Sequence, residues 1–497
     1  MIGNINCITY RGALKSCNYS CYYCPFSKND INNKELDIDK KAFDKFCETI
    51  SKCSFNNKIN ILIAPYGEAL IHKYYSIGIA KLSKNDKVNI IGIQTNLSWD
   101  AEKWIKDMKN EMADFKKITL WCTYHPTMTS LEKFVKKVEY LSEYINLSVG
   151  VVGDPTALDE IKALRDALPI QVYLWINNMD GKRRKYTEEE IVFFEEIDPL
   201  FSLEIRRYGE NYSCSCLKNH RFITAKGDMF FCNRNPKLLG NMYKTKNIID
   251  DDHCSKRRCD CYLSYSHLSN IKELQFFGGQ ELVRVPKRLD IKAIFLDVDG
   301  TITDKKGTIN KRTKRAINYL KEKVPIYLVT ERSYDSVMRK YSYLRNIISG
   351  GSFDNGAHII DYKSGYEKFC YITEEYDFSN YNIKIYSNEG KPYKLFFRYN
   401  ENKKLLEKFL DNQQFNVVNT RGRVTVVSKG VNKYNGLLEL CDKLSLDKEK
   451  ILTVGNDYND LDIIKKIKYS VAVKDAPDIL NKMAKYVIDV CDLVYII

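Results

Sequence analysis

Three cysteines lie close together near the start of the chain, at Cys17, Cys21 and Cys24. A group this compact can give three thiolates to three irons of an iron–sulfur cube and leave the fourth iron without a protein ligand. Zinc is the alternative, but a structural zinc ion takes four ligands, and the loop contains no fourth Cys or His. The nearest candidate, His72, is far away in sequence. We therefore expect a fold that gathers three thiols in one loop around a cluster with one open iron.

The spacing Cys-x3-Cys-x2-Cys resembles the signature of the radical S-adenosylmethionine (SAM) family, and Tyr23 matches the aromatic residue that precedes the third cysteine in that family. The resemblance implies a [4Fe–4S] cluster whose open iron is chelated by the amino and carboxylate groups of SAM. An electron from the cluster would cleave the sulfonium and give a 5′-deoxyadenosyl radical, which abstracts hydrogen from an unactivated carbon. Such an enzyme needs an electron donor, for example flavodoxin or ferredoxin.

Apolar runs alternate with amphipathic stretches after the cysteine loop. The runs predict strands over residues 59–64, 88–94, 117–122, 145–152 and 170–176, and the stretches predict helices over residues 41–52, 101–115, 131–144 and 158–167. Repeated strand–helix units imply a parallel sheet, here a partial (βα) barrel with its site at the carboxyl ends of the strands. We assign residues 1–210 to this domain.

Short motifs at the predicted strand ends resemble SAM-binding motifs of the same family. Residues 64–70 resemble its Gly-Gly-Glu-Pro motif, although Tyr66 and Ala69 depart from it. Residues 94–96 resemble its Thr-Asn turn, and residues 149–153 resemble the Gly-rich strand beside the adenine. By this resemblance, the residues that bind SAM are Tyr23, Gly67, Glu68, Thr95 and Asn96.

A second group of cysteines follows at Cys214, Cys216, Cys232, Cys254, Cys259 and Cys261. Residues 223–232 predict a two-stranded hairpin that ends in a cysteine. This region resembles the SPASM and twitch extensions of radical SAM enzymes, which hold auxiliary clusters. We expect one auxiliary [4Fe–4S] cluster in residues 211–270, with a four-cysteine zinc site as the alternative. Residues 271–288 are interpreted as a linker.

Two carboxylates end an apolar strand predicted over residues 291–296. Asp297 and Asp299 stand two positions apart, and Gly300 lets the chain turn sharply, so both acids can face one site. Phosphoryl transfer needs such a pair, because one carboxylate attacks phosphorus while the other gives and takes the proton on the leaving or attacking oxygen. The pair resembles the Asp-x-Asp-Gly-Thr motif of the haloacid dehalogenase (HAD) superfamily.

The rest of that signature follows in order along the chain. Thr330 ends a strand, and Lys433 precedes a helix. The resemblance implies that both bind the phosphate. The last motif of the signature lies in residues 451–460, where a strand ends in acids. It departs from the usual pattern at Asn456, which occupies the place of its first acid. Either Asp457 has taken over the ligand role, or Mg²⁺ binding is weakened. The carboxylates predicted to hold Mg²⁺ are Asp297, Asp299, Asp457 and Asp460.

Residues 353–357 and the mixed segment that follows resemble the α/β cap of Cof-type HAD phosphatases, which closes over small phosphorylated substrates. The predicted fold class is therefore α/β throughout. It comprises a partial (βα) barrel, a small Cys-rich extension and a Rossmann-like HAD domain over residues 289–497, with its cap at about 350–425.

Composition excludes some classes of protein. No stretch of the 497 residues approaches a membrane span, and residues 1–16 lack the apolar core of a signal peptide, so we expect a cytoplasmic protein with no membrane partner. The formal charge is +14, but the lysines and arginines are scattered among nearly as many acidic residues. This distribution argues for a solvated surface and against a nucleic-acid partner.

These patterns predict a bifunctional enzyme with a small-molecule substrate, in which radical SAM chemistry on a sugar or nucleotide accompanies Mg²⁺-dependent hydrolysis of a phosphate ester. Two alternatives remain open. One is a peptide- or RNA-modifying radical SAM enzyme with an accessory HAD domain. The other is an iron–sulfur sensor or scaffold whose HAD half is degenerate, although Asp297, Asp299, Thr330 and Lys433 are all present.

Overall fold

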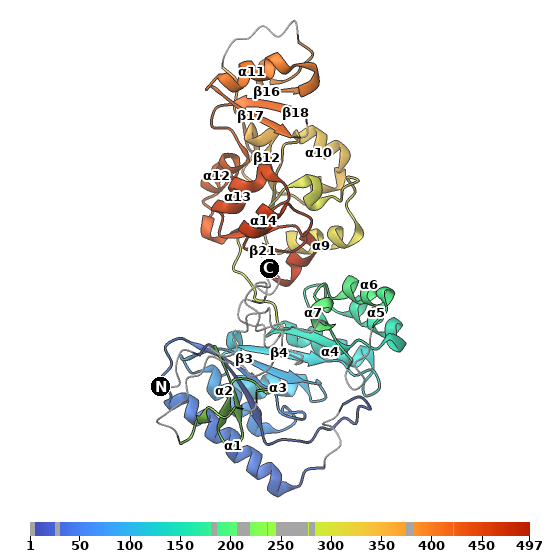
Figure 1. Ribbon diagram of the computed structural model, residues 1–497, viewed down its shortest axis with the longest axis vertical. Helices are drawn as coiled ribbons and strands as arrows, with labels where there is room; N and C mark the ends of the chain where they lie inside the picture. Colours follow the sequence, from blue (N-terminus) through green and yellow to red (C-terminus); the bar gives the residue numbers. More distant parts are fainter. Residues whose placement is uncertain are drawn as a thin grey trace. The chain divides into compact units, whose positions relative to one another are not determined.

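The computed structural model describes residues 5–24, 30–179, 186–205, 219–235, 237–244, 277, 284–373, 381–420 and 422–497. The chain divides into two compact units, a first unit of Met1–Lys287 and a second unit of Arg288–Ile497 (Figure 1). Within the described ranges, no helix is long and apolar enough to cross a membrane. Most of the predicted linker lies outside these ranges, and so do five cysteines of the predicted auxiliary site: Cys214, Cys216, Cys254, Cys259 and Cys261.

A nine-stranded sheet organises the described part of the first unit, in the order β6-β5-β4-β3-β2-β1-β7-β8-β9. The strands from β6 to β7 run parallel, and β8 and β9 continue the sheet antiparallel. The α/β class is confirmed, and the partial barrel stays a prediction. The strand bounds are β1 Cys7–Gly12, β2 Ile59–Ile63, β3 Val88–Thr95, β4 Ile118–Thr123, β5 Asn146–Val152, β6 Tyr173–Asn177, β7 His220–Thr224, β8 Asp228–Phe230 and β9 Gly240–Asn241.

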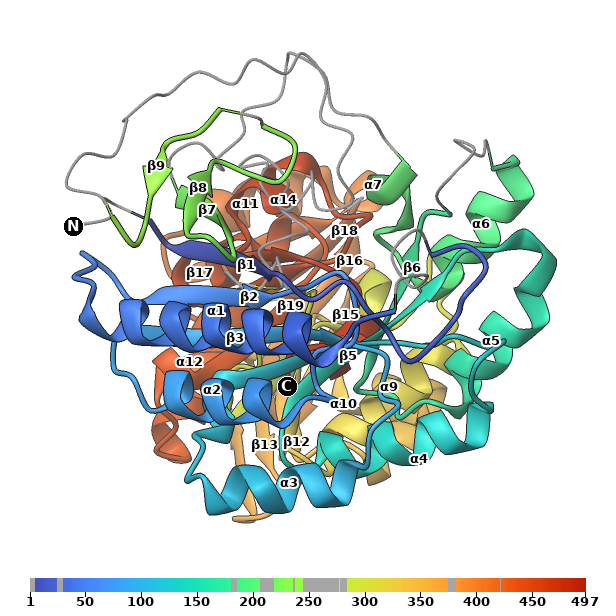
Figure 2. The ribbon, with the colours of Figure 1, turned by 90° about the horizontal axis from the view of Figure 1, so that it is seen from below.

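Helices connect the successive parallel strands and lie side by side along the sheet (Figure 2). The first begins at Asn32, whose side chain accepts hydrogen bonds from the backbone N–H groups of Lys34 and Glu35, while Glu35 caps the N–H of Asn32 in return. The helix bounds are α1 Asn33–Lys52, α2 Lys73–Ser83, α3 Ala101–Asn110, α4 Leu131–Ser142, α5 Leu158–Ala167, α6 Glu188–Ile197 and α7 Phe201–Ile205.

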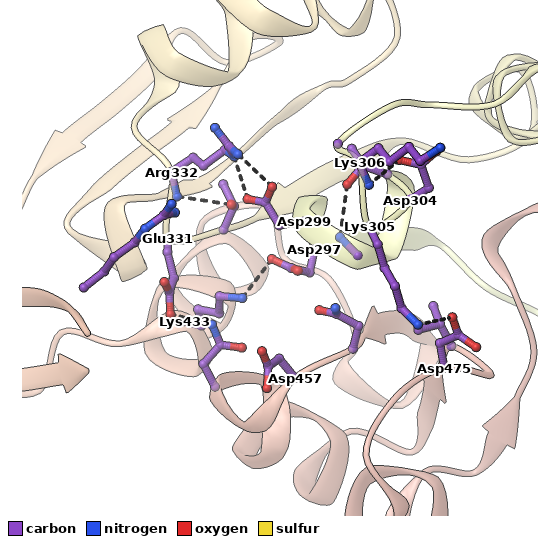
Figure 3. Close-up of a pocket in the computed structure, with 18 of the residues that line it drawn as sticks. Asp297, Asp299, Asp304, Lys305, Lys306, Glu331, Arg332, Lys433, Asp457 and Asp475 are labelled. Carbon is purple, nitrogen blue, oxygen red and sulfur yellow. Dashed lines mark hydrogen bonds and ion pairs between the residues drawn. The ribbon is translucent and has the colours of Figure 1, made fainter. Parts of the chain in front are cut away.

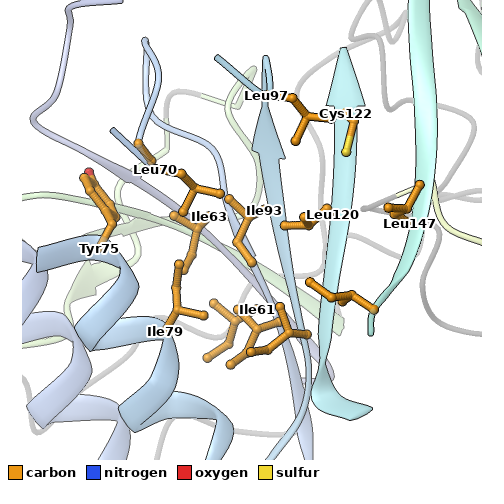
Figure 4. Close-up of a cluster of buried hydrophobic side chains, with 14 of the residues drawn as sticks. Ile61, Ile63, Leu70, Tyr75, Ile79, Ile93, Leu97, Leu120, Cys122 and Leu147 are labelled. Atoms are coloured by element: carbon orange, nitrogen blue, oxygen red, sulfur yellow. The ribbon is translucent and has the colours of Figure 1, made fainter. Parts of the chain in front are cut away.

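Alternate residues of each strand separate the two faces of this sheet. Ile61, Ile63, Ile93 and Leu120 share one face and pack with Ile79 of α2 in a single apolar core (Figure 4). Residues of the other parity face the opposite side of the sheet, among them Trp121, Ser148 and Trp175. The helix-covered face therefore holds the main core, and the strand ends are left to carry the functional groups.

The second unit is built on an eight-stranded sheet in the order β14-β13-β12-β11-β10-β19-β20-β21. The chain leaves β10 first towards β11 and later returns on the other side at β19, so β10 lies at a topological switch point where sites form. The strands are β10 Ala293–Leu296, β11 Ile326–Val329, β12 Gly350–Phe353, β13 His358–Asp361, β14 Tyr366–Phe369, β19 Ile451–Gly455, β20 Tyr469–Ala472 and β21 Tyr486–Val487. The helices are α9 Lys311–Lys321, α10 Tyr334–Lys340, α12 Lys433–Lys443, α13 Leu461–Lys466 and α14 Asp478–Met483.

A separate four-stranded antiparallel sheet, ordered β15-β16-β18-β17, and helix α11 form the cap. Their bounds are β15 Lys384–Asn388, β16 Lys391–Arg398, α11 Lys403–Asp411, β17 Phe415–Thr420 and β18 Arg423–Ser428. The cap has its own apolar cluster, which includes Leu395, Phe409 and Val426. Residues 350–369, which the sequence pattern assigned to the cap, instead extend the core sheet, because β12 pairs in parallel with β11 and carries β13 and β14 beside it.

Candidate functional site

The candidate active site of the second unit lies where the parallel strands end. Asp297 directly follows β10, and its backbone N–H donates to the carbonyl of Val454 in β19 (3.0 Å). Lys433 begins α12, and its ammonium lies 2.8 Å from Asp297 Oδ1 and 2.8 Å from Asp460 Oδ1 (Figure 3). All three charged side chains are buried. The fold thus brings together a lysine and an aspartate that are 136 positions apart in sequence.

Asp299 lies on the same turn as Asp297. Gly300 follows it with φ +76°, a conformation that L side chains rarely adopt, and the turn lets both acids reach one cavity. Arg332 binds Asp299 through two contacts, Nε to Oδ2 at 2.5 Å and Nη2 to Oδ1 at 2.7 Å. The backbone N–H of Arg332 donates to Thr330 Oγ1 (3.2 Å). Sequence patterns gave Arg332 no role, although its place two residues after Thr330 was an available signal.

The buried charges of this site depend on one another. Burial raises the pKa of Asp297, the Lys433 ammonium opposes the rise, and the Asp460 carboxylate adds to it. Burial alone would lower the pKa of Lys433, but the two carboxylates outweigh burial and raise it. Lys433 therefore stays protonated and compensates two buried carboxylates. Its removal would leave those charges unpaired in a medium of low dielectric constant.

A cavity of about 900 Å³ opens onto these groups, a volume suited to a small molecule. Its lining includes Arg423 of the cap strand β18, so both the core and the cap contribute to the wall. The four residues predicted to be catalytic all line this one cavity: Asp297, Asp299, Thr330 and Lys433.

The carboxylates predicted to hold Mg²⁺ divide into two sets. Asp297, Asp299 and Asp457 line the cavity. Asp460 is buried, and its Oδ1 is bound by the lysine that begins α12. Its Oδ2 accepts hydrogen bonds from the backbone N–H groups of Asn456 (2.9 Å) and Asp457 (3.3 Å). Asp460 thus anchors the loop and does not line the cavity, and its role as a Mg²⁺ ligand stays a prediction.

Asn456 stands in the cavity wall beside the turn that follows β10. A Cβ added at Gly300 would lie 2.1 Å from the side-chain amide nitrogen of Asn456, so the two residues are in close contact. Among the described residues, no group of three or more His, Cys, Asp or Glu side chains is arranged to hold a metal ion. The donor chemistry of the cavity nevertheless fits Mg²⁺, which prefers carboxylate and amide oxygens. The residues that would hold it are Asp297, Asp299, Asn456 and Asp457.

Comparison with known proteins places this site in a family. The family described as haloacid dehalogenase-like hydrolase matches residues 294–379 and 366–492. The second unit is a haloacid dehalogenase-like hydrolase domain. A phosphoglycolate phosphatase of Methanosarcina acetivorans is 25% identical over 211 residues, which cover 40% of this chain and 90% of that protein. A 5-amino-6-(5-phospho-D-ribitylamino)uracil phosphatase of Bacillus subtilis is 23% identical over 229 residues, 40% of this chain and 91% of its own. A haloacid dehalogenase-like hydrolase structure from Bacteroides thetaiotaomicron is 18% identical, with a TM-score of 0.36, over 41% of this chain and 98% of that one.

In the first unit, the three clustered cysteines lie in the loop after β1. Cys21 is buried, and Cys17 and Cys24 are half-buried. The segment after β2 packs tightly on this loop, since a Cβ at Gly67 would lie 1.7 Å from the carbonyl oxygen of Ser16. Glycine at position 67 is therefore required by a close backbone approach beside the cysteines.

Glu68 connects the ends of three neighbouring strands. It is buried, and its carboxylate accepts hydrogen bonds from Thr95 Oγ1 (2.8 Å), Asn96 N (2.6 Å) and Leu70 N (3.1 Å). Asn96 in turn donates from Nδ2 to Cys17 Sγ (3.5 Å). Burial raises the pKa of Glu68 to about 7, although the hydrogen bonds oppose the rise. Glu68 thus holds the turn after β3, and its implied contact with the amino group of SAM stays a prediction.

Tyr23 contacts a residue that sequence patterns did not single out. Its hydroxyl is 2.6 Å from Nδ1 of His125, which follows β4, and the two rings are stacked with centroids 5.9 Å apart. Burial lowers the pKa of His125 to about 4, so the imidazole is neutral at pH 7. A second cavity of about 390 Å³ lies on this side of the loop, and its lining includes Tyr22, Tyr23, Tyr124, Val151, Val152 and Asp154.

The predicted Gly-rich strand has a packing explanation in β5. A Cβ at Gly150 would lie 2.7 Å from Trp121 Nε1 and 2.9 Å from Asn177 Nδ2. A Cβ at Gly153 would lie 2.8 Å from Ile176 Cγ2. Both glycines thus make room for side chains of the adjacent strands.

The cysteine loop fits an iron–sulfur cluster in its donor chemistry. Besides Asn96, the backbone N–H of Tyr19 points at Cys17 Sγ (3.4 Å), and N–H groups of this kind stabilise cluster thiolates. Burial and, to a smaller extent, the neighbouring cysteines raise the pKa of Cys21 to about 11, so this thiol is neutral at pH 7 without a nearby cation. Cys232 follows β8 in the confirmed hairpin of β7 and β8.

Proposed function

We propose that the hydrolase domain cleaves the phosphate monoester of a small metabolite by covalent catalysis. The arrangement of Asp297 against Lys433 in the same cavity as Asp299 carries this proposal. Asp297 attacks phosphorus, and Asp299 gives a proton to the departing ester oxygen. Water then attacks the aspartyl phosphate, Asp299 takes a proton from that water, and inorganic phosphate leaves with Asp297 regenerated.

The surrounding cations have separate tasks in this scheme. Lys433 orients Asp297 through Oδ1 and offsets the negative charge that gathers around phosphorus. Arg332 orients Asp299 through its two contacts and, being a planar guanidinium, can also bind phosphate oxygens. Mg²⁺ held by Asp297, Asp299, Asn456 and Asp457 would neutralise part of the charge between the anionic nucleophile and the anionic ester.

Support for a small substrate comes from the cavity and from the relatives. The cavity of about 900 Å³ accommodates a metabolite, and Arg423 of the cap lines it with a cationic side chain. The similar proteins are named as phosphatases of phosphoglycolate and of a phosphorylated ribitylaminouracil, both small phosphate esters. We therefore place sugar phosphates, nucleotides and phosphorylated acids first among candidate substrates.

The test is phosphate release by the full chain from a panel of such esters, with Mg²⁺ and with EDTA. Hydrolysis with Mg²⁺ and its loss in EDTA are expected. Absence of release from every small ester in the presence of Mg²⁺ would overturn the proposal.

We further propose that residues 1–210 bind SAM and a [4Fe–4S] cluster on Cys17, Cys21 and Cys24, reduced by a flavodoxin or a ferredoxin. Supporting observations are the single loop at the carboxyl end of β1, the N–H donors at Cys17 Sγ and the cavity beside Tyr23. When bound, the cluster and SAM supply an electron and a cleavable sulfonium, and the strand ends position them. An auxiliary cluster on the later cysteines belongs to the same proposal.

Anaerobic reconstitution of the full chain with iron and sulfide tests this second proposal. The protein should form 5′-deoxyadenosine from SAM, and replacement of Cys17, Cys21 and Cys24 by Ala should abolish that product and spare phosphatase activity. Unchanged 5′-deoxyadenosine formation in the triple variant would contradict the assignment. If the later cysteines hold a cluster, the triple variant stays brown, whereas zinc without iron would favour the four-cysteine zinc site.

A further inference from the structure

A buried ion pair joins the cap to the core of the hydrolase domain. Lys394 belongs to the cap strand β16, and its ammonium lies 2.6 Å from Oδ1 of Asp354, which follows the core strand β12. The side chains are 6% and 0% exposed, respectively. The same ammonium donates to the backbone carbonyl of Glu331 (3.1 Å), the residue between Thr330 and Arg332. One cap lysine therefore contacts two loops of the core.

The turn of residues 354–356 touches both sides of the active site. The backbone N–H of Asp354 donates to the carbonyl of Arg332 (3.0 Å), and that of Asn355 donates to the carbonyl of Thr330 (3.1 Å). On its other side, a Cβ at Gly356 would lie 2.5 Å from the carbonyl of Asn432, the residue before Lys433. The turn thus lies between the loop that carries Thr330 and the start of α12.

This turn has three successive residues with positive φ, and its side chains make few polar contacts. Asp354 and Asn355 have φ values of +53° and +58°, and Gly356 has φ +98°. Left-handed conformations are less costly for Asp and Asn than for other non-glycine residues, but two in succession persist only where the surroundings enforce them. Asp354 Oδ2 and Asn355 Nδ2 are buried without a hydrogen-bond partner in the part of the chain that the structure describes. The ammonium of Lys394 is accordingly a principal restraint on the turn.

We propose that Lys394 is a positioning residue of the phosphatase site. By binding Asp354 and the carbonyl of Glu331, it makes the geometry of the Thr330 loop depend on a docked cap. Because Arg332 in that loop holds Asp299, the proton shuttle is correctly placed only when the cap supplies this lysine. The inference rests on the proposed phosphatase activity, and its experiments separate the two.

Lys384 offers a matched control on the same cap sheet. Both lysines lie over the ring of Tyr386, with ammonium-to-centroid distances of 4.7 Å for Lys394 and 4.6 Å for Lys384. Lys384 is exposed, and the described residues include no contact between it and Asp354. Lys394→Met and Lys384→Met therefore remove the same charge from the same ring, but only the first releases the turn.

Hydrogen exchange of the full chain measures how strongly Lys394 restrains the turn of residues 354–356, and it needs no substrate. In Lys394→Met the backbone amides of Asp354 and Asn355 should exchange at least ~10-fold faster than in the wild type, because their acceptors lie in the loop that has been released. Lys384→Met should leave both rates unchanged. Equal protection of these amides in the wild type and Lys394→Met would overturn the proposal, even if the wild type proves to have no phosphatase activity.

Kinetics distinguish positioning from simple charge balance. With p-nitrophenyl phosphate and Mg²⁺, Lys394→Met should lower kcat at least ~10-fold with a smaller change in KM, since a misplaced proton shuttle affects the transition state more than ground-state binding. In the double variant Lys394→Met/Asp354→Asn no buried carboxylate is left unpaired, so thermal stability should recover while kcat stays low. Recovery of kcat together with stability would mean that Lys394 only balances charge, and would overturn the inference.

Discussion

Asp297 combines two properties at the scale of a single residue: it is buried beside an ammonium, and it ends a strand at the floor of a cavity. Replacing it by Asn keeps the size of the side chain but removes the proposed nucleophile. We expect Asp297→Asn to lower Mg²⁺-dependent hydrolysis of p-nitrophenyl phosphate by at least ~10³-fold while the chain stays folded. Asp290→Asn, at an exposed acid just before β10, is the control and should keep wild-type activity. Activity that survives in Asp297→Asn would mean that another residue attacks phosphorus.

His220 is a second residue whose protonation state follows from its contacts. Its Nδ1 lies 2.6 Å from the carbonyl of Phe231, which can only accept, so Nδ1 carries the proton. Nε2 therefore accepts from the hydroxyl of Thr9 (2.9 Å). This neutral tautomer joins β1 to β7 in the interior of the first unit.

Through this histidine acid lowers the stability of the first unit, whereas the raised pKa of Glu68 acts in the opposite sense. Burial lowers the pKa of His220 to about 4, whereas an unfolded histidine titrates near ~6.5. As pH falls from ~6.5 to ~4 the unfolded state binds the proton on this histidine first, so His220 alone lowers the free energy of unfolding by up to ~3 kcal/mol. His220→Gln should remove this contribution and so change the slope of the unfolding free energy against pH, leaving the contributions of His125 and Glu68. All four tryptophans belong to the first unit, so their fluorescence in urea reports on it. An unaltered slope in His220→Gln would refute this account.

Among the elements, α1 holds the start of the cysteine loop. Asp39 of α1 accepts hydrogen bonds from the backbone N–H groups of Ala13 (2.7 Å) and Leu14 (2.8 Å), and from the hydroxyls of Tyr74 (2.7 Å) and Tyr75 (2.9 Å) in α2. One buried carboxylate therefore ties two helices to the chain segment that leads to the cysteines.

Loss of this carboxylate should be costly. Asp39→Ala leaves four donors without their acceptor, and we expect the unfolding free energy of the first unit to fall by at least ~3 kcal/mol. Asp37→Ala on the same helix removes an exposed ion pair with Lys41 and should change stability by less than ~1 kcal/mol. Urea unfolding followed by tryptophan fluorescence measures both. Similar shifts for the two variants would contradict the role given to Asp39.

Local patterns predicted the parallel strands β2 to β6 of the first unit and the two strands that lead to Asp297 and Thr330, because a buried parallel strand requires an apolar run and its site requires a polar group at the end. The prediction for α1 began eight residues late because the capping signal of Asn32 and Glu35 was not used. Residue roles that depend on distant contacts could not be predicted in this way. Asp460 has the chemistry of a metal ligand, and only the fold shows it bound to Lys433. Lys394 becomes part of the site through a neighbour 40 positions away.

At the scale of the whole molecule, the two units have separate cores. We expect residues 288–497, produced alone, to fold and to hydrolyse p-nitrophenyl phosphate with kcat and KM within about 3-fold of the full chain, since domains with independent cores fold independently. Circular dichroism and steady-state kinetics check this expectation. A fragment that is unfolded or inactive, beside an active full chain, would show that the phosphatase needs the first unit.

The position of β1 inside its sheet has a consequence for synthesis on the ribosome. β1 pairs on one side with β2 and on the other with β7, whose partner residues lie more than two hundred positions later. At translation rates of ~5–20 residues per second, roughly 10–40 s pass between the emergence of the two strands. Throughout that interval the nascent chain exposes an unpaired strand edge next to its three cysteines. Chaperone binding during synthesis would protect both, and a pause that lengthens the interval should lower the yield of folded protein.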